Sequence, residues 1–564
     1  MCGIAGILSF RPGIVSKEVL KRMTDAIMHR GPDGEGQWID ASARVGLGHR
    51  RLSIIDLSAA GAQPMRYMDR YSITFNGEIY NYLELREELE RKGVAFVSQT
   101  DTEVLLALYH LEGEACLRRL DGMWAFAIWD DLRQELFCAR DRFGEKPFHY
   151  YKDANAFYFA SEMKALWVAG VPKEVGEDAM SAYERARRVH VPARLGDTFY
   201  KNIFKLEHSH WMRVHADGRT SITRYYDIDW RKQDFPGTMQ EAVEEFRRLF
   251  IGSLRYRCRS DVPVGTSLSG GLDSSSIVCN VARWKGQGQV SPHTFSARFE
   301  GYKKDEGYFI EKVIERTGVI PHFVRPTGEE MFRDLDTLCY HQEEPFASAS
   351  IYAQYRVQQL AKEHGISVLI DGQGADELLA GYTYYYPIYL QSMHGLNVPW
   401  RTRLKEHRAY QEHDTTGNAR KPWVGLTDIR QSMTYLRRGR TISLNEVLHR
   451  NFTKGPLQEL LRYADRNSMA HGREVRLPFL GHELVEFCFS LPDDRKLQLG
   501  WTKYVMRKAF EDVLPPEVAW RRDKLGFEVP EEDWLRRYAP GRTWYRIMRE
   551  KFDPDHAFKE PKGS

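Results

Sequence analysis

The segment "VPVGTSLSGGLDSSSIV", residues 262–278, has the pattern of an apolar strand, a turn rich in glycine and serine, and a helix that begins near Asp273. Consecutive backbone N–H groups in such a turn, at the positive end of a helix dipole, form a cradle for anions. The segment has neither the lysine of the Walker pattern nor the spacing of the dinucleotide fingerprint. We therefore expect a phosphate-binding turn of another nucleotide-binding class.

Helix and strand patterns alternate along the chain on both sides of this turn, from residue 235 onward. We expect helices at 238–256, 273–284 and 305–318, and strands at 262–268, 292–298 and 320–325. This alternation predicts an α/β fold with a parallel sheet. Further along, residues 391–440 are polar and irregular in pattern.

The first 210 residues have a different texture. Short strand patterns such as "YSITFNGEIY" (71–80) and "GMWAFAIWD" (122–130) surround two helical patterns at 81–93 and 100–113. Many strands with few helices favour a layered α+β domain. The chain is thus divided by the sequence into a domain at 1–210, a linker at 211–234, a second domain at 235–535, and a surface tail at 536–564.

Size and composition agree with two domains and exclude several classes of partner. The 564 residues exceed the roughly 250–300 at which a single core stops growing. The balance of 81 basic and 78 acidic residues gives no indication of nucleic-acid or lipid binding. No run of about 18 apolar residues predicts a membrane span. Seven scattered cysteines without paired spacing favour a reducing cytoplasm.

Cys2 follows the initiator methionine directly. Because methionine aminopeptidase accepts small second residues, we expect Met1 to be removed and Cys2 to carry the free α-amino group. An α-amino group has an ordinary pKa of about 7.7–8.0, so a nucleophilic thiol and a general base would stand on one residue.

Five motifs follow Cys2 in a fixed order: "CGIAGI" (2–7), "HRGPDGEG" (29–36), "HRRLSIIDL" (49–57), "NGEIYN" (76–81) and "TDTEV" (100–104). Together they resemble the N-terminal-nucleophile glutaminase domain of class II glutamine amidotransferases. The resemblance implies an αββα layered sandwich in which Cys2 attacks glutamine and Asn76 and Gly77 stabilise the oxyanion. It also implies a glutamine-binding set that consists of Arg51, Ile54, Asn76, Glu78 and Asp101.

The string "SGGLDSS" (269–275) resembles the pyrophosphate loop of N-type ATP pyrophosphatases, which adenylate a carboxylate and release pyrophosphate. The resemblance implies that Asp273 and Asp376 share Mg²⁺, an ion that prefers oxygen ligands. The ATP-binding residues that it implies are Leu268, Ser269, Gly270, Gly271, Asp273, Ser274, Ser275, Ala297, Gly372 and Gln373.

Two later segments, "LLRYADRNSMAHGREVRLPFL" (460–480) and "WTKYVMRKAF" (501–510), extend the resemblance to the asparagine synthetases. It covers about 1–210 and 235–530 and assigns Lys503 to the transition state of adenylation or amidation. The implied reaction uses glutamine, ATP and a carboxylate acceptor, aspartate by default, and releases AMP and pyrophosphate. Ammonia would pass through an internal channel faced by the motifs of Arg30, Arg142 and Asn76, and relatives commonly form homodimers.

The sequence departs from this family at the acceptor site. Gln373 stands where asparagine synthetases often have a glutamate that takes a proton from ammonia, and glutamine cannot act as a base, so Glu377 and Glu344 are alternatives. Ser348 and Ser350 stand in place of the threonine and arginine that bind aspartate in one bacterial branch. A sugar acid of surface-polysaccharide synthesis therefore remains the alternative acceptor.

Overall fold

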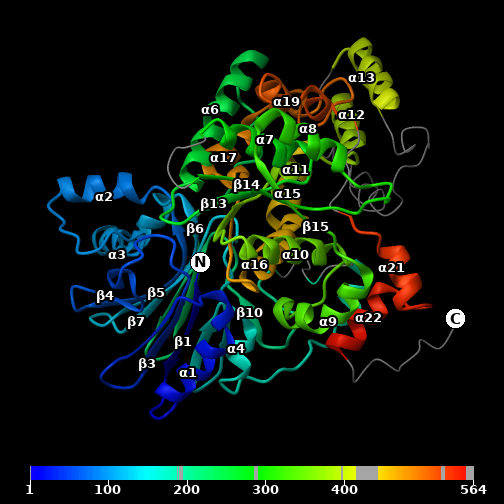
Figure 1. Ribbon diagram of the computed structural model, residues 1–564. Coiled ribbons are helices and arrows are strands. Elements are labelled where there is room, and N and C mark those ends of the chain that lie inside the picture. The colour runs from blue at the N-terminus through cyan, green and yellow to red at the C-terminus, as the bar shows by residue number, and fades with distance from the viewer. Residues whose placement is uncertain are drawn as a thin grey trace.

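Two six-stranded antiparallel sheets lie face to face in the N-terminal half of the chain (Figure 1). The computed structural model describes residues 2–186, 189, 195–284, 290–395, 398–413, 443–522 and 528–553. The first sheet has the order β10-β8-β9-β1-β3-β2 and the second β12-β11-β7-β6-β5-β4. Their strands are β1 (Gly3–Ser9), β2 (Gly34–Ile39), β3 (Val45–Arg51), β4 (Met65–Tyr67), β5 (Tyr71–Ile79), β6 (Gly122–Asp130), β7 (Glu135–Arg140), β8 (His149–Lys152), β9 (Ala156–Ala160), β10 (Ile203–Lys205), β11 (His210–His215) and β12 (Thr220–Arg224).

Helices cover the outer face of each sheet. The helices α1 (Lys17–Ala26) and α4 (Met163–Trp167) pack on the first sheet, and α2 (Tyr82–Arg91) and α3 (Asp101–Glu112) lie beside the second. Between the sheets, apolar side chains such as Ile4 and Trp129 are buried. The expected αββα sandwich and both expected helices are confirmed. Shorter helical segments are η1 (Met28–Arg30), η2 (Ala59–Gly61), η3 (Gly113–Arg118) and α5 (Ala179–Ala186).

A five-stranded parallel sheet organises the second half of the chain. Its order is β15 (Ile320–Val324), β14 (Val290–Ala297), β13 (Val264–Ser267), β16 (Val368–Ile370) and β17 (Glu474–Arg476). The strand that follows β13 in the sequence, β14, pairs with one edge of β13, and the later strand β16 pairs with its other edge. Ligands of open α/β sheets bind where the strand order reverses in this way, at the carboxyl ends of the strands.

The expected helix and strand order from residue 235 is confirmed, with bounds that differ by at most two residues. The helices of this half are α6 (Met239–Arg257), α7 (Leu272–Ala282), α8 (Gly307–Thr317), α9 (Gly328–Gln342), α10 (Ser350–Glu363), α11 (Ala375–Leu378), α12 (Tyr385–Gly395), α13 (Trp400–His413), α15 (Leu444–Lys454), α16 (Pro456–Met469), η4 (Pro478–Leu480), α17 (His482–Ser490), α18 (Asp493–Lys496), α19 (Tyr504–Phe510), α20 (Pro516–Ala519), α21 (Glu531–Tyr538) and α22 (Trp544–Phe552).

Two sequence-based boundaries need correction. The expected linker at 211–234 begins inside β11 and contains β12, which complete the second sheet of the sandwich. The expected irregular stretch at 391–440 contains the helix α13, and its residues 414–440 lie outside the described part of the chain. Both errors have one cause, since short polar segments show too little apolar periodicity to reveal an edge strand or an exposed helix.

The expected surface tail at 536–564 also needs correction, because α22 packs into the body of the protein. Trp544 is 5% exposed, and its indole Nε1 donates to the Phe346 carbonyl at 2.8 Å. Ile547, Met548 and Phe552 are buried in the same apolar cluster, which also contains residues of α9 and α10. Residues 554–564 lie outside the described part of the chain.

The two halves share one apolar core. Leu52, Tyr80 and Met123 of the sandwich are buried in the same cluster as Phe250 and Leu480 of the second half. Such a shared core means that residues of both halves shape the space between their sites. Among the described residues, the structure has no helix with the length and hydropathy needed to span a bilayer.

We predict that Trp544→Ala lowers the free energy of unfolding by about 3–5 kcal/mol, because it opens a cavity and orphans the Phe346 carbonyl. Urea denaturation followed by circular dichroism measures the change. The matched control is Trp400→Ala, since Trp400 is 63% exposed, and it should change stability by less than about 0.5 kcal/mol. Equal effects of the two substitutions would contradict the packing of α22.

Candidate active sites

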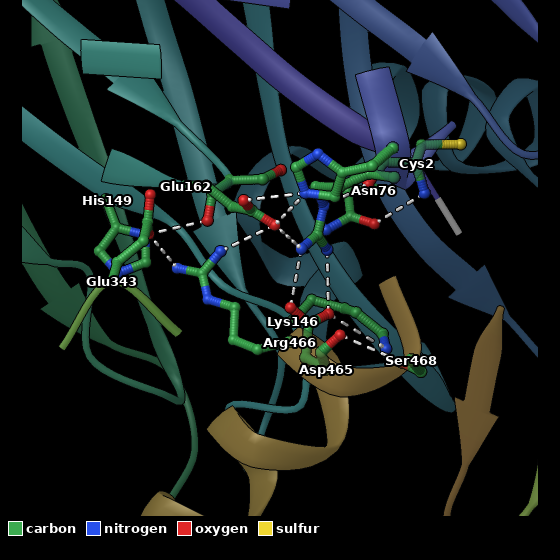
Figure 2. A network of polar contacts seen from close by, with 12 residues as sticks. Cys2, Asn76, Lys146, His149, Glu162, Glu343, Asp465, Arg466 and Ser468 are labelled. Carbon is green, nitrogen blue, oxygen red and sulfur yellow. Dashed lines mark hydrogen bonds and ion pairs between the residues drawn. The ribbon is translucent and has the colours of Figure 1, made fainter. Parts of the chain in front are cut away.

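Cys2 lies directly before β1, a central strand of the first sheet, and faces β5 of the second sheet. Its backbone N–H donates to Asn76 Oδ1 at 3.0 Å (Figure 2). Cys2 is 8% exposed, and its thiol lies 4.0 Å from the Leu52 carbonyl oxygen. Burial raises the pKa of the Cys2 thiol. The thiol is therefore neutral at rest and needs a base before it can attack a substrate.

Two donors for an oxyanion lie beside Cys2. Asn76 is fully buried, and its Nδ2 has no hydrogen-bond partner among the described residues. An orphaned buried donor in a native protein calls for an explanation, and a developing negative charge would supply one. Gly77 follows at φ +155°, and a Cβ there would lie 2.1 Å from the Met123 carbonyl oxygen. Only glycine fits this position, so the backbone N–H of residue 77 can approach a ligand closely.

An acidic cluster lies next to this donor pair. Glu78 and Asp101 are 6% and 5% exposed, and Asp101 Oδ2 accepts a hydrogen bond from the Ile79 N–H at 2.8 Å. Burial, together with the carboxylates of Glu474 and Asp101, raises the pKa of Glu78. Burial, together with the Glu474 carboxylate, raises the pKa of Asp101 to about 6. Three buried carboxylates, those of Glu78, Asp101 and Glu474, gather here beside the guanidinium of Arg476, and such a cluster is suited to a cationic group.

Arg51 ends β3, which pairs with β1, the strand that follows Cys2. Its guanidinium donates to the carbonyls of Ser58, at 2.8 Å, and Asp56, and so orders the loop that carries Ile54. Ile54 is 2% exposed and belongs to the shared core. The structure therefore brings together all the residues expected to handle glutamine: Cys2, Arg51, Ile54, Asn76, Gly77, Glu78 and Asp101.

The second site lies at the carboxyl ends of β13 and β16, where the strand order reverses. Gly270 has φ +78° in the turn after β13, and the Ser269 N–H donates to Ser274 Oγ at 3.2 Å. The turn opens the helix α7 at Leu272, one residue before the expected start. Ser296 Oγ donates to the Leu268 carbonyl at 2.6 Å and brings the end of β14, with Ala297, against the same turn.

The turn after β16 packs against the turn after β13. A Cβ at Gly372 would lie 3.0 Å from Cβ of Asp273, so glycine permits the two turns to meet. Gln373 is partly buried, and its Oε1 has no hydrogen-bond partner among the described residues. The two turns thus gather the expected ATP-binding residues Leu268, Ser269, Gly270, Gly271, Asp273, Ser274, Ser275, Ala297, Gly372 and Gln373 at one edge of the sheet.

Lys503 joins the two turns. Its Nζ lies 2.6 Å from both carboxylate oxygens of Asp273 and 2.6 Å from Asp376 Oδ1. Lys503 has φ +53°, a left-handed conformation that costs a non-glycine residue about 1–3 kcal/mol and is typical of functional sites. A Cβ at Gly381 would lie 1.9 Å from Asp376 Oδ1 and 2.2 Å from Cε of Lys503, so a side chain there would displace the Lys503–Asp376 pair.

The donor set fits Mg²⁺. Asp273 and Asp376 already converge on one cation, the Lys503 ammonium, and carboxylate oxygens are the protein ligands that Mg²⁺ prefers. Within the described ranges, no three histidine, cysteine, aspartate or glutamate side chains form a metal-binding set. Mg²⁺ usually keeps one or two protein carboxylates and takes its other ligands from water and phosphates, which agrees with two aspartates.

The sequence-based prediction missed three arginines of this site. Arg507, Arg521 and Arg522 line one cleft together with Gly271 and Lys503. Arg521 donates to the Gly270 carbonyl at 2.9 Å, and so fixes the phosphate turn from the outside. Arg507 lies in α19, four residues after Lys503, whose left-handed backbone directly precedes that helix. No local pattern in the sequence marks these three arginines.

The alternative bases occupy different places. Glu377 lies next to Asp376, where burial and that carboxylate raise its pKa to about 7, and Tyr382 donates to it at 2.8 Å. Glu344 instead accepts a hydrogen bond from the Phe199 N–H at 2.8 Å and pairs with Arg462. These contacts place Glu344 against the sandwich, and Glu377 is the alternative that lies beside Asp376 at the Lys503 site.

The two serines of the expected acceptor region line a different opening from the Lys503 cleft. Ser348 and Ser350 line an open groove with Lys303, Lys304 and Glu531, and none of these residues lines the cleft.

Comparison with known proteins assigns the two halves to families. Residues 1–226 match the family model of a glutamine amidotransferase domain, and residues 245–556 match that of asparagine synthase. The first match includes β11 and β12, in agreement with the corrected boundary.

Full-length relatives share both parts. The chain is 34% identical to "Asparagine synthetase [glutamine-hydrolyzing] 1" of Bacillus subtilis, over 95% of this chain and 88% of the relative. It is 32% identical to "Asparagine synthetase [glutamine-hydrolyzing] 3" of the same organism, over 93% and 86% of the two chains. It is 38% identical to "Putative asparagine synthetase [glutamine-hydrolyzing] 2" of Methanocaldococcus jannaschii, over 68% and 76%. The chain belongs to the asparagine synthase family, with a glutamine amidotransferase domain in front of the synthase domain.

Proposed function

We propose that the protein is a glutamine-dependent asparagine synthetase, which hydrolyses glutamine at Cys2 and uses ATP to convert aspartate to asparagine with release of AMP and pyrophosphate. The observation that carries the proposal is the pairing of Cys2 with Asn76, whose unpartnered Nδ2 stands beside the nucleophile. The family membership supports the ATP-dependent half of the reaction. Mg²⁺, a homodimer and a cytoplasmic location belong to the same proposal.

Glutamine hydrolysis follows from the groups around Cys2. Once Met1 is removed, the α-amino group takes the proton of the thiol, and the thiolate attacks the amide carbon of glutamine. Asn76 Nδ2 and the Gly77 N–H donate to the oxyanion that forms. Collapse of this intermediate expels ammonia with the proton and leaves a thioester on Cys2. Water then cleaves the thioester and releases glutamate.

The charged residues around Cys2 recognise the α-ammonium and α-carboxylate groups of glutamine. Glu78 and Asp101 pair with the α-ammonium group, and the guanidinium of Arg51 pairs with the α-carboxylate in a two-pronged contact. Because the acidic pocket is buried, these contacts are stronger than they would be at the surface.

Adenylation follows from the phosphate turn. The N–H groups of residues 269–271 and the helix α7 bind phosphate oxygens, while an oxygen of the acceptor carboxylate attacks the α-phosphorus and pyrophosphate leaves. Lys503 and the arginines of the cleft meet the negative charge of the departing pyrophosphate. When bound, Mg²⁺ held by Asp273 and Asp376 would neutralise phosphate charge. Ammonia then attacks the acyl-adenylate and displaces AMP.

Transfer of ammonia inside the protein is supported by the shared boundary of the two sites. Arg476 of β17 lies 3.6 Å from Glu78 in the glutamine pocket, and its carbonyl accepts a hydrogen bond from the Asp371 N–H at 2.9 Å. Asp371 directly follows β16 and opens the turn that carries Gln373 and Asp376. One adjacent pair of strands therefore borders both sites.

We predict that Cys2→Ala abolishes asparagine formation from glutamine and retains asparagine formation from ammonium chloride, because the second site is left intact. Lys503→Ala should lower both activities by at least about a hundredfold, as expected for loss of transition-state charge stabilisation. Amino-acid analysis of the products measures both. Loss of the ammonia-dependent activity in Cys2→Ala would contradict two separate sites.

We predict that aspartate, with ATP, Mg²⁺ and glutamine, gives stoichiometric AMP and pyrophosphate with the purified enzyme. A parallel screen with uronic acids and other carboxylates measures pyrophosphate release for each acceptor. Release with a uronic acid and background release with aspartate would replace aspartate by a sugar acid and retain the rest of the mechanism.

We predict that glutamine binds about tenfold more weakly at pH 5 than at pH 7, because the pKa of Asp101 is raised to about 6 and only its ionised form pairs with the α-ammonium group. Below this pKa Asp101 is protonated, so the affinity falls as the pH falls. Calorimetry on Cys2→Ala measures binding without turnover. Adding Asp101→Asn should flatten the profile, and an unchanged profile in that double variant would refute the assignment.

A further inference from the structure

Arg30 holds the main chain of Cys2 in place. Arg30 ends η1, is fully buried, and donates from Nε to the Cys2 carbonyl at 3.1 Å. On the other side, the Cys2 N–H donates to Asn76 Oδ1 at 3.0 Å (Figure 2). The nucleophile is therefore fixed through both polar groups of its own backbone, and one of these two contacts depends on where the guanidinium of Arg30 lies.

Asp465 fixes that guanidinium from the synthase domain. Its Oδ2 accepts from Arg30 Nη1 at 2.8 Å and its Oδ1 from Nη2 at 2.9 Å, a two-pronged geometry that defines the plane of the guanidinium. Asp465 lies in α16 and is 5% exposed. Burial by itself raises the pKa of Asp465, but the charge of Arg30 outweighs it and holds the pKa below its ordinary value, so the carboxylate is ionised at neutral pH.

Arg466, which follows Asp465 in α16, makes a second set of ion pairs, in which the positive charge belongs to α16. Arg466 Nη1 pairs with Glu162 of the sandwich at 2.9 Å, and Arg466 Nη2 pairs with Glu343 at 2.8 Å. Glu162 also accepts from Arg30 Nη1 at 2.8 Å. Figure 2 shows Glu162, Glu343, Asp465 and Arg466 in this continuous network. Carboxylate and guanidinium thus alternate across the boundary, and each matches an opposite charge in the docking of α16 that places Asp465 against Arg30.

We propose that Asp465 is a positioning residue for glutamine hydrolysis, which acts through Arg30 to hold Cys2 at the oxyanion donors. This inference rests on the proposed role of Cys2 as the nucleophile. An aspartate 435 residues away in the sequence thus completes the glutaminase site. The glutaminase depends for its geometry on the synthase domain, so a detached sandwich would hold a misplaced nucleophile.

The substitution Asp465→Asn removes one of the two hydrogen bonds between residue 465 and the Arg30 guanidinium, and it leaves the size of the side chain almost unchanged. The amide has one acceptor oxygen, and its NH₂ group faces an N–H of Arg30, so the guanidinium loses its fixed plane. A displacement of about 1 Å at a reacting atom can cost about a hundredfold in rate. The residues that bind glutamine are unchanged, so the effect falls on kcat.

The test compares Asp465→Asn with wild type in three assays: glutamate release from glutamine, alkylation of Cys2 by iodoacetamide from pH 6 to 9, and pyrophosphate release with ammonium chloride. We expect kcat for glutamine to fall at least about tenfold, KM to stay within about twofold, and the ammonia-dependent rate to stay within about twofold. The rate of Cys2 alkylation against pH should change as well. Asp465→Glu, which restores the charge, should recover part of kcat.

Asp493→Asn is the matched control. Asp493 is another buried aspartate of the synthase domain, 7% exposed, and it accepts from Gln233 at 2.7 Å, remote from the Arg30 network. It should leave kcat for glutamine unchanged. If Asp465→Asn does not fold, Arg30→Lys makes the same test. The lysine ammonium keeps the positive charge but cannot form the two parallel hydrogen bonds to the Asp465 carboxylate.

Each outcome decides between the proposals. Unchanged kcat for glutamine in Asp465→Asn or Arg30→Lys, with an active wild type, overturns the positioning role and leaves the proposed function standing. Equal losses of the glutamine- and ammonia-dependent rates, with a lower melting temperature, also overturn it, because they indicate a purely structural contact. A wild-type enzyme that releases no glutamate overturns the proposed function itself.

Discussion

The contact between Arg476 and Glu78 crosses the boundary between the two halves, and Arg476 adjoins both candidate sites through Glu78 and Asp371. Arg476 belongs to an edge strand of the parallel sheet, is fully buried, and lies 3.6 Å from the carboxylate of Glu78 in the sandwich. A buried guanidinium is tolerated only when anions surround it, and here Glu474 and Glu78 supply them. The acidic cluster beside Cys2 therefore contains residues of both halves, and the sandwich and the sheet share one apolar core next to it.

Both sites use backbone positions that few residue types can occupy. Gly77 and Gly381 stand where a Cβ would overlap neighbouring atoms, and Lys503 has a left-handed backbone. At each place the local cost accompanies a close approach. The main chain of Gly77 lies against the Met123 carbonyl, and the ammonium of Lys503 lies 2.6 Å from carboxylate oxygens of Asp273 and Asp376. The surrounding cores stabilise these conformations, in agreement with the tendency of strain to collect at functional sites.

Features that depend on local sequence patterns were predictable, whereas features that depend on contacts between distant residues were not. The helix and strand order from residue 235 was predictable because each element carries its own apolar period, and the phosphate turn because glycine and serine at a helix start are a local pattern. The sequence did not predict four other elements, namely the strands β11 and β12, the helix α13 and the buried helix α22. Their placement depends on partners such as β7 or Phe346, which the local composition does not reveal.

The sequence by itself determined which chemistry the chain carries: a thiol at position 2, amide and glycine donors at Asn76 and Gly77, and a glycine-rich turn before α7. These are properties of residue types at short spacing. Only the tertiary structure decided which distant groups meet them, since Arg521 against Gly270 and Asp465 against Arg30 are separated by 251 and 435 residues. Contacts of that range are fixed by packing of whole domains, and this is why the arginines of the cleft and the support of Cys2 were found only in the folded protein.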